Sequence, residues 1–294
     1  MRLLTLHDGY MTQIPFTKMH GLGNNYVYFD TFKHDLKEHS LPQLAQSVSN
    51  IHTGIGSDGI ILMGPSERAS LKMRIFNKDG SEAKNCGNGL RCVAKLAYDA
   101  GYVKTKTFSI ETLGGIVEAT IESSSAHQAM VSIDMGIPRL LRSEIPMLGS
   151  PHERVIGEPF NVAGHHLHLT AVSMGNPHAV FFVPQISESL HMSLGPIIEK
   201  DARFPERINV EFVEVVSPSE MICRVWERGS GVTQACGTGA CAVVVAAILN
   251  QYLQKQTRIS VHLEGGVLEI EWLSNDHIRM TGPAETIASG VWLR

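Results

Sequence analysis

Val225–Val245 reads VWERGSGVTQACGTGACAVVV and places Cys236 directly before a run of small and apolar residues. This run predicts a buried helix that begins just after the cysteine. The N–H groups at a helix start have no partner within the helix, and together with the helix dipole they favour negative charge. A cysteine at this position therefore combines a thiol of lowered pKa with a place to hold an anion, although one such motif alone is also typical of an inert buried cysteine.

The same arrangement occurs a second time in the chain. Residues 76–93 read FNKDGSEAKNCGNGLRCV, in which Cys86 also precedes a glycine-rich helix start. Further matches follow in the same order: Asn77 with Glu227, Gly23-Asn24 with Gly175-Asn176, LGGIVEATI at 113–121 with EGGVLEIEW at 264–272, and MGIP at 135–138 with MTGP at 280–283. The repeated order predicts two copies of one unit of about 125 residues.

Each copy is predicted to be an α+β unit in which short strands surround one long helix. The two helices are expected from Gly89 towards Gly101 and from Gly239 to about Leu253. No series of parallel βαβ units is evident. Residues 143–164 carry prolines and no periodic pattern, which indicates a linker, so the second copy is expected to begin near His165.

Composition restricts the functions that this chain can have. Its 294 residues suffice for two domains, and 43% hydrophobic and 18% charged residues are typical of a globular protein. A net charge of −4 argues against nucleic acid, and no apolar run approaches the roughly 20 residues that span a bilayer. We expect no signal peptide, and therefore a cytoplasmic location with reduced cysteines. We also expect no metal site, because the cysteine spacing typical of zinc sites is missing.

Two repeated cysteine loops suit one particular chemistry. Copies of one unit commonly pack about a pseudo-two-fold axis, so the loops are expected to face each other across an inter-domain cleft. Inverting a stereocentre by proton transfer needs a base on one face and an acid on the other, and these groups exchange roles in reverse. Cysteine suits both roles because its unperturbed pKa is about 8.5. Helix-start N–H groups could bind an α-carboxylate, and nothing in the sequence suggests a pyridoxal site.

Five motifs extend the argument to nearly the whole chain. FTKMHGLGNN, NKDGSEAKNCGNGLRC, SMGNPHAV, ERINVEF and VWERGSGVTQACGTGACA closely resemble the diaminopimelate epimerase family between about Phe16 and Trp292. The resemblance implies cofactor-independent interconversion of LL- and meso-2,6-diaminopimelate, for lysine and peptidoglycan precursor synthesis. It also implies one catalytic cysteine per domain and a last strand that returns to the first domain. The expected domains are residues 11–130 with about 282–294, and residues 131–281, in a homodimer.

The resemblance also assigns roles to individual residues. Cys86 and Cys236 would be the catalytic thiols, with His178 near the reacting centre. The distal amino-acid end of the substrate would be held by Asn24, Asn77, Asn176, Asn209, Glu227 and Arg228. The α-carboxylate cradle would comprise Gly87, Asn88, Gly237 and Thr238. A planar guanidinium suits a carboxylate, and carboxylate or amide oxygens suit an ammonium group.

Two positions depart from the family pattern. Asn25 stands where the family often has an aspartate, and Gly59 stands where a glutamine is frequent. Both concern the rim of the expected pocket and not the two thiols. The remaining cysteines, Cys92, Cys223 and Cys241, lie in apolar surroundings and are expected to be packing residues.

Two other functions fit paired cysteines. A proline or hydroxyproline racemase of the same fold typically carries Asp-Arg-Ser-Pro before its second cysteine, where this chain has ERGSGVTQA. A thiol-redox or binding protein would instead join the two cysteines reversibly, which requires Cα atoms within about 7 Å.

Overall fold

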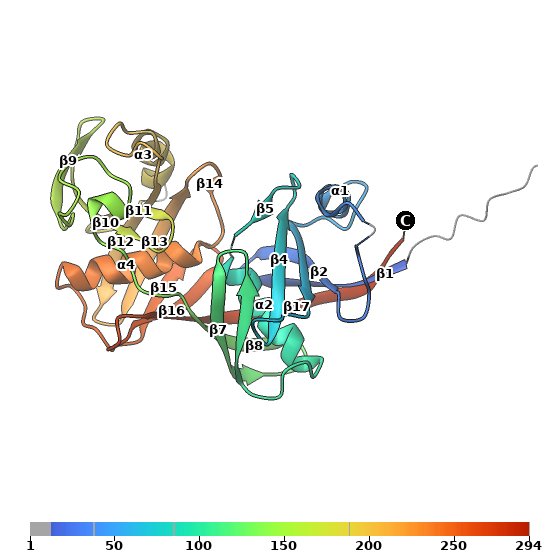
Figure 1. Ribbon diagram of the computed structural model, residues 1–294. Helices are drawn as coiled ribbons and strands as arrows, with labels where there is room; N and C mark the ends of the chain where they lie inside the picture. The colour runs from blue at the N-terminus through green and yellow to red at the C-terminus, as the bar shows by residue number, and fades with distance from the viewer. Residues whose placement is uncertain (1–12, 38, 85, 188, 294) are drawn as a thin grey trace, which may run out of the picture.

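The computed structural model describes residues 13–37, 39–84, 86–187 and 189–293. Residues 11, 12, 38, 85 and 294 of the predicted first domain therefore lie outside the described part of the chain. Figure 1 shows two lobes, each built from strands that surround a long helix, with one strand running from the second lobe into the first. Within the described residues, no helix has the length and apolar character needed to cross a membrane.

The first copy contains eight strands and two helices. In chain order these are β1 (Gln13–Gly21), β2 (Asn24–Asp30), α1 (Leu41–Ser49), β3 (Gly59–Gly64), β4 (Leu71–Asn77), β5 (Glu82–Ala83), α2 (Gly87–Asp99), β6 (Thr107–Thr112), β7 (Gly115–Ser124) and β8 (Gln128–Asp134).

The second copy begins with the 3-10 turn η1 (Arg142–Glu144) and strand β9 (Glu158–Val162), and then repeats the order of the first. It continues with β10 (His165–Ser173), β11 (Pro177–Phe182), α3 (Leu190–Glu199), β12 (Asn209–Ser217), β13 (Glu220–Glu227), β14 (Gly231–Val232), α4 (Gly237–Leu249), β15 (Ile259–Leu263), β16 (Gly266–Trp272) and β17 (Ile278–Leu293). The match of β1–β8 to β10–β17, element for element, confirms the predicted repeat.

The two central helices are buried for different reasons. Helix α4 consists of apolar and small residues on all sides, and most of its length is buried. Helix α2 is amphipathic, yet Arg91 and Lys95 on it are fully buried. The Lys95 ammonium pairs with Asp99 and donates to the Ser125 carbonyl at 2.9 Å, so its burial is compensated. The predicted helix starts, Gly89 and Gly239, were close, since the two helices begin two residues earlier, at Gly87 and Gly237.

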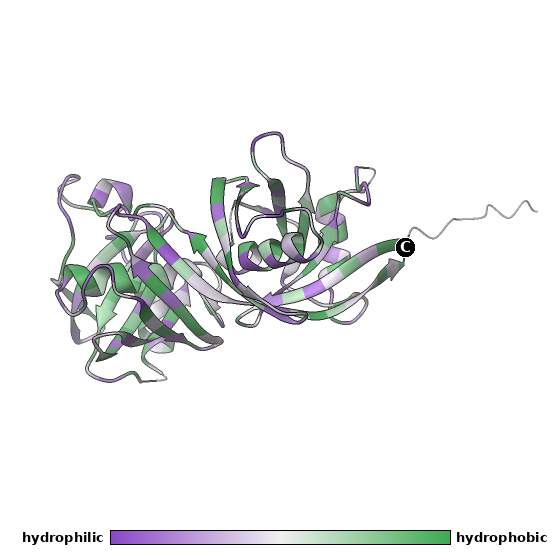
Figure 2. Ribbon diagram, turned by 90° about the horizontal axis from the view of Figure 1, so that it is seen from below, coloured by the Kyte–Doolittle hydropathy of each residue, from purple (hydrophilic) through white to green (hydrophobic). Residues whose placement is uncertain are grey.

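Strands β8 and β17 join the two copies. They pair antiparallel from Gln128–Asp134 to Arg279–Glu285, and the hydroxyls of Ser132 and Thr281 lie 2.7 Å apart at this junction. Because β8 and β17 are equivalent elements, their antiparallel pairing is what a pseudo-two-fold axis requires. Beyond the junction β17 continues along β1, and Figure 2 shows hydrophilic and hydrophobic residues interspersed along this ribbon.

The expected linker at residues 143–164 is wrong. Strand β9 lies inside it and pairs antiparallel with β10, and Ile145, Val155 and Phe160 are buried in the core of the second lobe. Strand β9 occupies beside β10 the place that the end of β17 occupies beside β1. A five-residue strand with one buried face carries too few apolar residues to show a period among prolines and charges.

The expectations of short strands and no βαβ units also need correction. Each helix connects two parallel strands: α1 joins β2 to β3, α2 joins β4 to β6, α3 joins β11 to β12, and α4 joins β13 to β15. Strand β17 is also long, with 16 residues. The parallel pairs alternate with antiparallel hairpins in a mixed sheet, so the strands do not read as the continuous apolar runs of an all-parallel sheet.

Candidate active site

Each repeated cysteine caps the helix that follows it. Cys86 and Cys236 have extended backbones at the N-caps of α2 and α4. The Cys86 Sγ accepts from the Gly89 N–H at 3.4 Å, and the Cys236 Sγ accepts from the Gly239 N–H at 3.3 Å. A sulfur in this position receives a backbone donor and faces the positive end of the helix dipole. Both effects stabilise a thiolate relative to a thiol.

The two cysteine loops are in contact with each other. The Asn88 Nδ2 of the first copy donates to the carbonyl of Ala235, next to Cys236, at 3.4 Å. Met280 lies between the two helix starts: a Cβ added to Gly87 would lie 2.7 Å from its Cε, and one added to Gly237 would lie 3.0 Å from its Sδ. Glycine at both helix starts therefore permits the close approach of the loops.

The surroundings of Cys86 include one cation. Its Sγ lies 3.5 Å from the Asn24 Oδ1, and the Arg91 guanidinium donates to the Asn88 Oδ1 at 2.8 Å. Burial raises the pKa of the Cys86 thiol, while the Gly89 N–H, a hydrogen bond with the Tyr26 hydroxyl and the charge of Arg91 act in the opposite direction. Arg91 is itself fully buried. Its Nε also donates to the Pro283 carbonyl at 3.0 Å, which helps to compensate this burial.

The surroundings of Cys236 are acidic. Burial and the carboxylates of Glu227 and Glu211 raise the pKa of the Cys236 thiol well above its usual range, although the Thr238 hydroxyl and the Gly239 N–H oppose them. The Cys236 Sγ lies 3.5 Å from the Thr238 Oγ1. Glu211 is fully buried, and the register of β12 points it to the same face as Asn209.

The two half-sites differ at equivalent positions. Strand β2 pairs with β3 as β11 pairs with β12, so Tyr26 corresponds to His178 and Ile61 corresponds to Glu211. The helix starts support this match, because an added Cβ at Gly89 would meet Ile61 and one at Gly239 would meet Glu211. The pair of His178 and Glu211 therefore occurs in the second copy alone. Comparing the two cysteine motifs does not reveal this pair, because it lies outside both motifs.

The residues expected to bind the distal end of a substrate fall into two groups. In the second copy, the Asn209 Oδ1 accepts from the Arg228 N–H at 2.8 Å, and the Glu227 Oε1 accepts from the Thr233 hydroxyl at 2.5 Å. The Arg228 side chain is exposed, and burial raises the pKa of Glu227. In the first copy, Asn77 donates to the Ser81 hydroxyl at 3.1 Å, without a hydrogen bond to the other expected residues within the described chain.

Asp58 is a residue that the sequence analysis missed. Its Oδ2 accepts from the Asn24 Nδ2 at 2.9 Å and from the Asn25 backbone at 2.8 Å, and so holds the first loop in place. The Asn25 Nδ2 lies 3.4 Å from the same oxygen, where an aspartate would repel the Asp58 carboxylate. The departure at Gly59 has a steric reason, since an added Cβ would lie 2.2 Å from the Phe76 carbonyl. The signal available in the sequence was the position of Asp58 among the glycines Gly54, Gly56 and Gly59.

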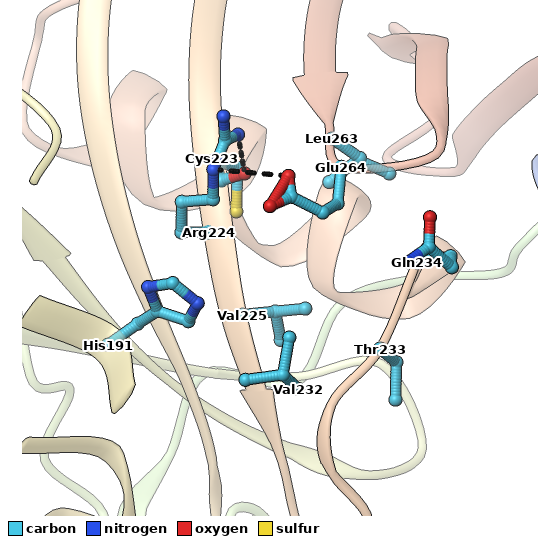
Figure 3. Close-up of a pocket in the computed structure, with 9 residues that line it drawn as sticks. All are labelled: His191, Cys223, Arg224, Val225, Val232, Thr233, Gln234, Leu263 and Glu264. Atoms are coloured by element: carbon cyan, nitrogen blue, oxygen red, sulfur yellow. Dashed lines mark hydrogen bonds and ion pairs between the residues drawn. The ribbon is translucent and has the colours of Figure 1, made fainter. Parts of the chain in front are cut away.

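A small cavity lies beside the second copy of the site. Figure 3 shows it between β13 and the 232–234 segment, with the Arg224 guanidinium 3.6 Å from the Glu264 carboxylate. Its volume is about 10 Å³, which is room for one water molecule. None of the expected site residues lines it. It is too small to hold an amino acid.

Two thiols at equivalent helix starts, each beside N–H groups that can hold a carboxylate, suit the removal and return of a proton at a carbon next to that carboxylate. This arrangement defines the class of two-base racemases and epimerases. The sequence model described as diaminopimelate epimerase matches residues 16–141 and 170–287. The chain is also 59% identical over 282 residues to the diaminopimelate epimerase of Geobacillus kaustophilus (strain HTA426), covering 96% of this chain and 97% of that protein. The chain belongs to the diaminopimelate epimerase family.

Solved structures of low sequence identity share the fold. The crystal structure of methylitaconate-delta-isomerase is 14% identical, with a TM-score of 0.67, and the match covers 96% of each chain. A hydroxyproline epimerase from Agrobacterium vitis, with bound trans-4-OH-L-proline, is 13% identical with a TM-score of 0.64, covering 96% of this chain and 92% of that one. These likenesses confirm the predicted epimerase-like fold, whereas family membership decides against the racemase alternative.

Proposed function

We propose that this protein is a diaminopimelate epimerase that interconverts LL- and meso-2,6-diaminopimelate without a cofactor. The observation that carries the proposal is the pair of helix-capping thiols, Cys86 and Cys236, on loops joined by the Asn88–Ala235 hydrogen bond. This reaction belongs to the synthesis of lysine and of peptidoglycan precursors. The substrate is inferred from family membership, and the two thiols are proposed to carry out both proton transfers.

In the proposed reaction, one thiolate removes the α-proton from one face of the substrate carbon. The other thiol donates a proton to the opposite face, which inverts the stereocentre, and the two cysteines exchange roles in the reverse direction. The α-carboxylate is held by N–H groups at the starts of α2 and α4, at Gly87, Asn88, Gly237 and Thr238. These donors also stabilise the negative charge that develops during proton removal.

The distal amino-acid end is proposed to bind to a set of polar side chains around the two thiols. The exposed guanidinium of Arg228 would receive the distal carboxylate, and Glu227 would receive the distal ammonium group. The asparagine amides complete this set: Asn24, Asn77, Asn176 and Asn209. A substrate with only one amino-acid head would make no contact with these groups, which predicts selectivity for diaminopimelate over proline.

We extend the proposal to the assembly and location. The domains are residues 11–130 with about 282–294, and residues 131–281. The end of β17 exposes Ile287, Val291 and Leu293 by 51%, 48% and 53%, which suits an isologous contact in a homodimer. Sedimentation velocity of the wild type and of Val291→Lys tests this, with a monomeric wild type as the contradicting result. A cytoplasmic location would keep the thiols reduced.

The deciding experiment follows deuterium at the α-carbon. The purified protein is incubated with LL-diaminopimelate in D₂O with no added cofactor, beside Cys86→Ser and Cys236→Ser. Serine retains a helix cap but is a far weaker acid than a thiol, so both variants are expected to lose formation of the meso isomer. Cys241→Ser, on α4 but away from its start, is the matched control. Exchange into proline but not diaminopimelate would overturn the substrate assignment.

A further inference from the structure

A chain of hydrogen bonds leads from the buried carboxylate of Glu211 to the thiol of Cys236. The Glu211 Oε1 lies 2.6 Å from the His178 Nδ1, and the His178 Nε2 lies 3.1 Å from the Asn176 Oδ1. The Asn176 Nδ2 then donates to the Thr238 Oγ1 at 3.1 Å, and that hydroxyl lies 3.5 Å from the Cys236 Sγ. Glu211 and His178 are fully buried, so water does not replace these partners.

Both ring nitrogens of His178 face oxygen atoms. A neutral imidazole has one donor nitrogen and one acceptor nitrogen, whereas an imidazolium donates from both. With the Asn176 amide in this orientation, only the imidazolium donates to the Glu211 Oε1 and to the Asn176 Oδ1 together. Since Thr238 already accepts from Asn176, its own hydrogen is free to point at the Cys236 Sγ. The sulfur then receives two donors, the Thr238 hydroxyl and the Gly239 N–H, and is an acceptor as a thiolate is.

We propose that Glu211 is a positioning residue that sets the charge of Cys236 through His178, Asn176 and Thr238. With an imidazolium at His178, every hydrogen bond of the chain is directed towards a thiolate at Cys236. With a neutral imidazole, the Asn176 amide turns over and every bond reverses, so that a Cys236 thiol donates to Thr238. The proton lost by the Cys236 Sγ is matched by the proton gained at the His178 Nε2. In both states the His178 Nδ1–H donates to the Glu211 carboxylate.

The first copy has no counterpart of this chain. The positions of His178 and Glu211 are taken by Tyr26 and Ile61, and the charged group near Cys86 is Arg91. The two thiols of one symmetric reaction thus have their charges set by different means. A fixed guanidinium acts on Cys86, and a histidine that can change its charge acts on Cys236.

Other ionisable groups face this chain, and they predict the opposite sign for a test. Glu227 and Glu211 both raise the pKa of Cys236, and Cys223 on β13 also faces Glu211. If Glu211 acted only as a nearby negative charge, its removal would lower the pKa of Cys236. If it acts through the imidazolium of His178, its removal leaves a neutral histidine and favours the Cys236 thiol. The direction of the change therefore separates the two roles.

The experiment compares Glu211→Gln with the wild type in the absence of substrate. Alkylation of each cysteine by iodoacetamide is timed by mass spectrometry at fixed pH, and the protonation of His178 is read by ¹⁵N NMR of histidine-labelled protein, assigned with His178→Asn. We expect Cys236 to react roughly tenfold or more slowly, which is one pKa unit or more, and His178 to lose its imidazolium signal. Cys86 should react as before, which shows that the variant is folded.

Glu214→Gln is the matched control, because Glu214 lies on the same strand and accepts from the Ile186 N–H at 2.8 Å, away from the cysteines. Unchanged or faster alkylation of Cys236 in Glu211→Gln would overturn the proposal. If that variant does not fold, a neutral His178 in the wild type at pH 7 overturns it equally. The catalytic role of Cys236 rests on the proposed function. Both measurements omit substrate, so a result that overturns the role of Glu211 would leave the epimerase activity untouched.

Discussion

The Asn88 side chain links the two cysteine loops, since its Nδ2 donates to the carbonyl of Ala235 at 3.4 Å, one residue before Cys236. The same nitrogen lies 3.3 Å from the Asn24 Oδ1, and the Asn88 Oδ1 accepts from Arg91 at 2.8 Å. One buried amide therefore ties the first helix start to the second loop and to the cation below it. The spacing of the two thiols depends on contacts between residues 147 positions apart.

Asn88→Ala should loosen this link. It removes the bond to Ala235 and leaves the Arg91 guanidinium without one buried acceptor, which costs about 1–3 kcal/mol of unfolding free energy. We expect kcat/KM to fall by at least tenfold, because proton transfer is sensitive to the placement of both thiols. Denaturant unfolding and epimerase assays measure the two effects. Asn275→Ala, an exposed turn residue, is the control, and equal activity in the two variants would contradict the prediction.

Gly87→Ala tests the close approach of Met280. The added Cβ would lie 2.7 Å from the Met280 Cε, so the flexible end of that side chain must shift, at a cost of about 1–3 kcal/mol. Combining Gly87→Ala with Met280→Ala should recover part of the loss, because the clash is absent in the double variant. Thermal unfolding of the two single variants and the double variant completes the cycle. Strictly additive losses would show that Met280 does not determine the need for glycine.

Arg91→Met should change both stability and the pH dependence of activity. The variant leaves the Pro283 carbonyl and the Asn88 Oδ1 without their buried donor, which costs about 2–4 kcal/mol. Arg91 also lowers the pKa of Cys86, so removal of its charge should move the ionisation of that thiol to higher pH.

The rate of Cys86 alkylation, followed against pH, checks this shift. Arg279→Met removes an exposed arginine paired with Glu271 and serves as the control, for which no shift is expected. A Cys86 profile that stays in place in Arg91→Met would show that the helix start alone sets its charge.

Asp201→Asn tests the anchoring of the segment that contains β9. The Asp201 carboxylate binds the Arg203 guanidinium at 2.7 and 2.8 Å, and Arg203 lies 3.5 Å over the ring of Phe160 on β9. The hydrogen bonds with Arg203 hold the pKa of Asp201 below its usual range, so its stabilising contribution is present at neutral pH and is lost as pH falls through the lowered pKa.

The variant should therefore be less stable than the wild type at pH 7 by up to about 1 kcal/mol, since the pair is partly exposed, and the difference should disappear in acid. Urea unfolding at pH 7 and near pH 3 measures this. Asp35→Asn, on an exposed carboxylate, should show no comparable loss at pH 7. A difference that persists unchanged in acid would exclude the ionised carboxylate as its source.

Local patterns were sufficient to predict the repeat and the two cysteine-capped helices, whereas the epimerase-like fold was implied by the family resemblance of five motifs. Small residues after Cys86 and Cys236 predict helix starts because glycine and a capping side chain act within one turn. Strand β9 and the parallel crossovers were missed, because pairing between distant segments leaves little trace in a local period.

The amino-acid sequence by itself determined where each thiol sits relative to its own helix, since that relationship spans three residues. Only the tertiary structure decided what surrounds each thiol. Arg91 reaches Cys86 through a helix turn, but Glu211 reaches Cys236 through His178, Asn176 and Thr238, from three separate elements. A charge buried by long-range packing acts on whatever the fold places beside it, and for that reason two halves with one motif have thiols in different electrostatic surroundings.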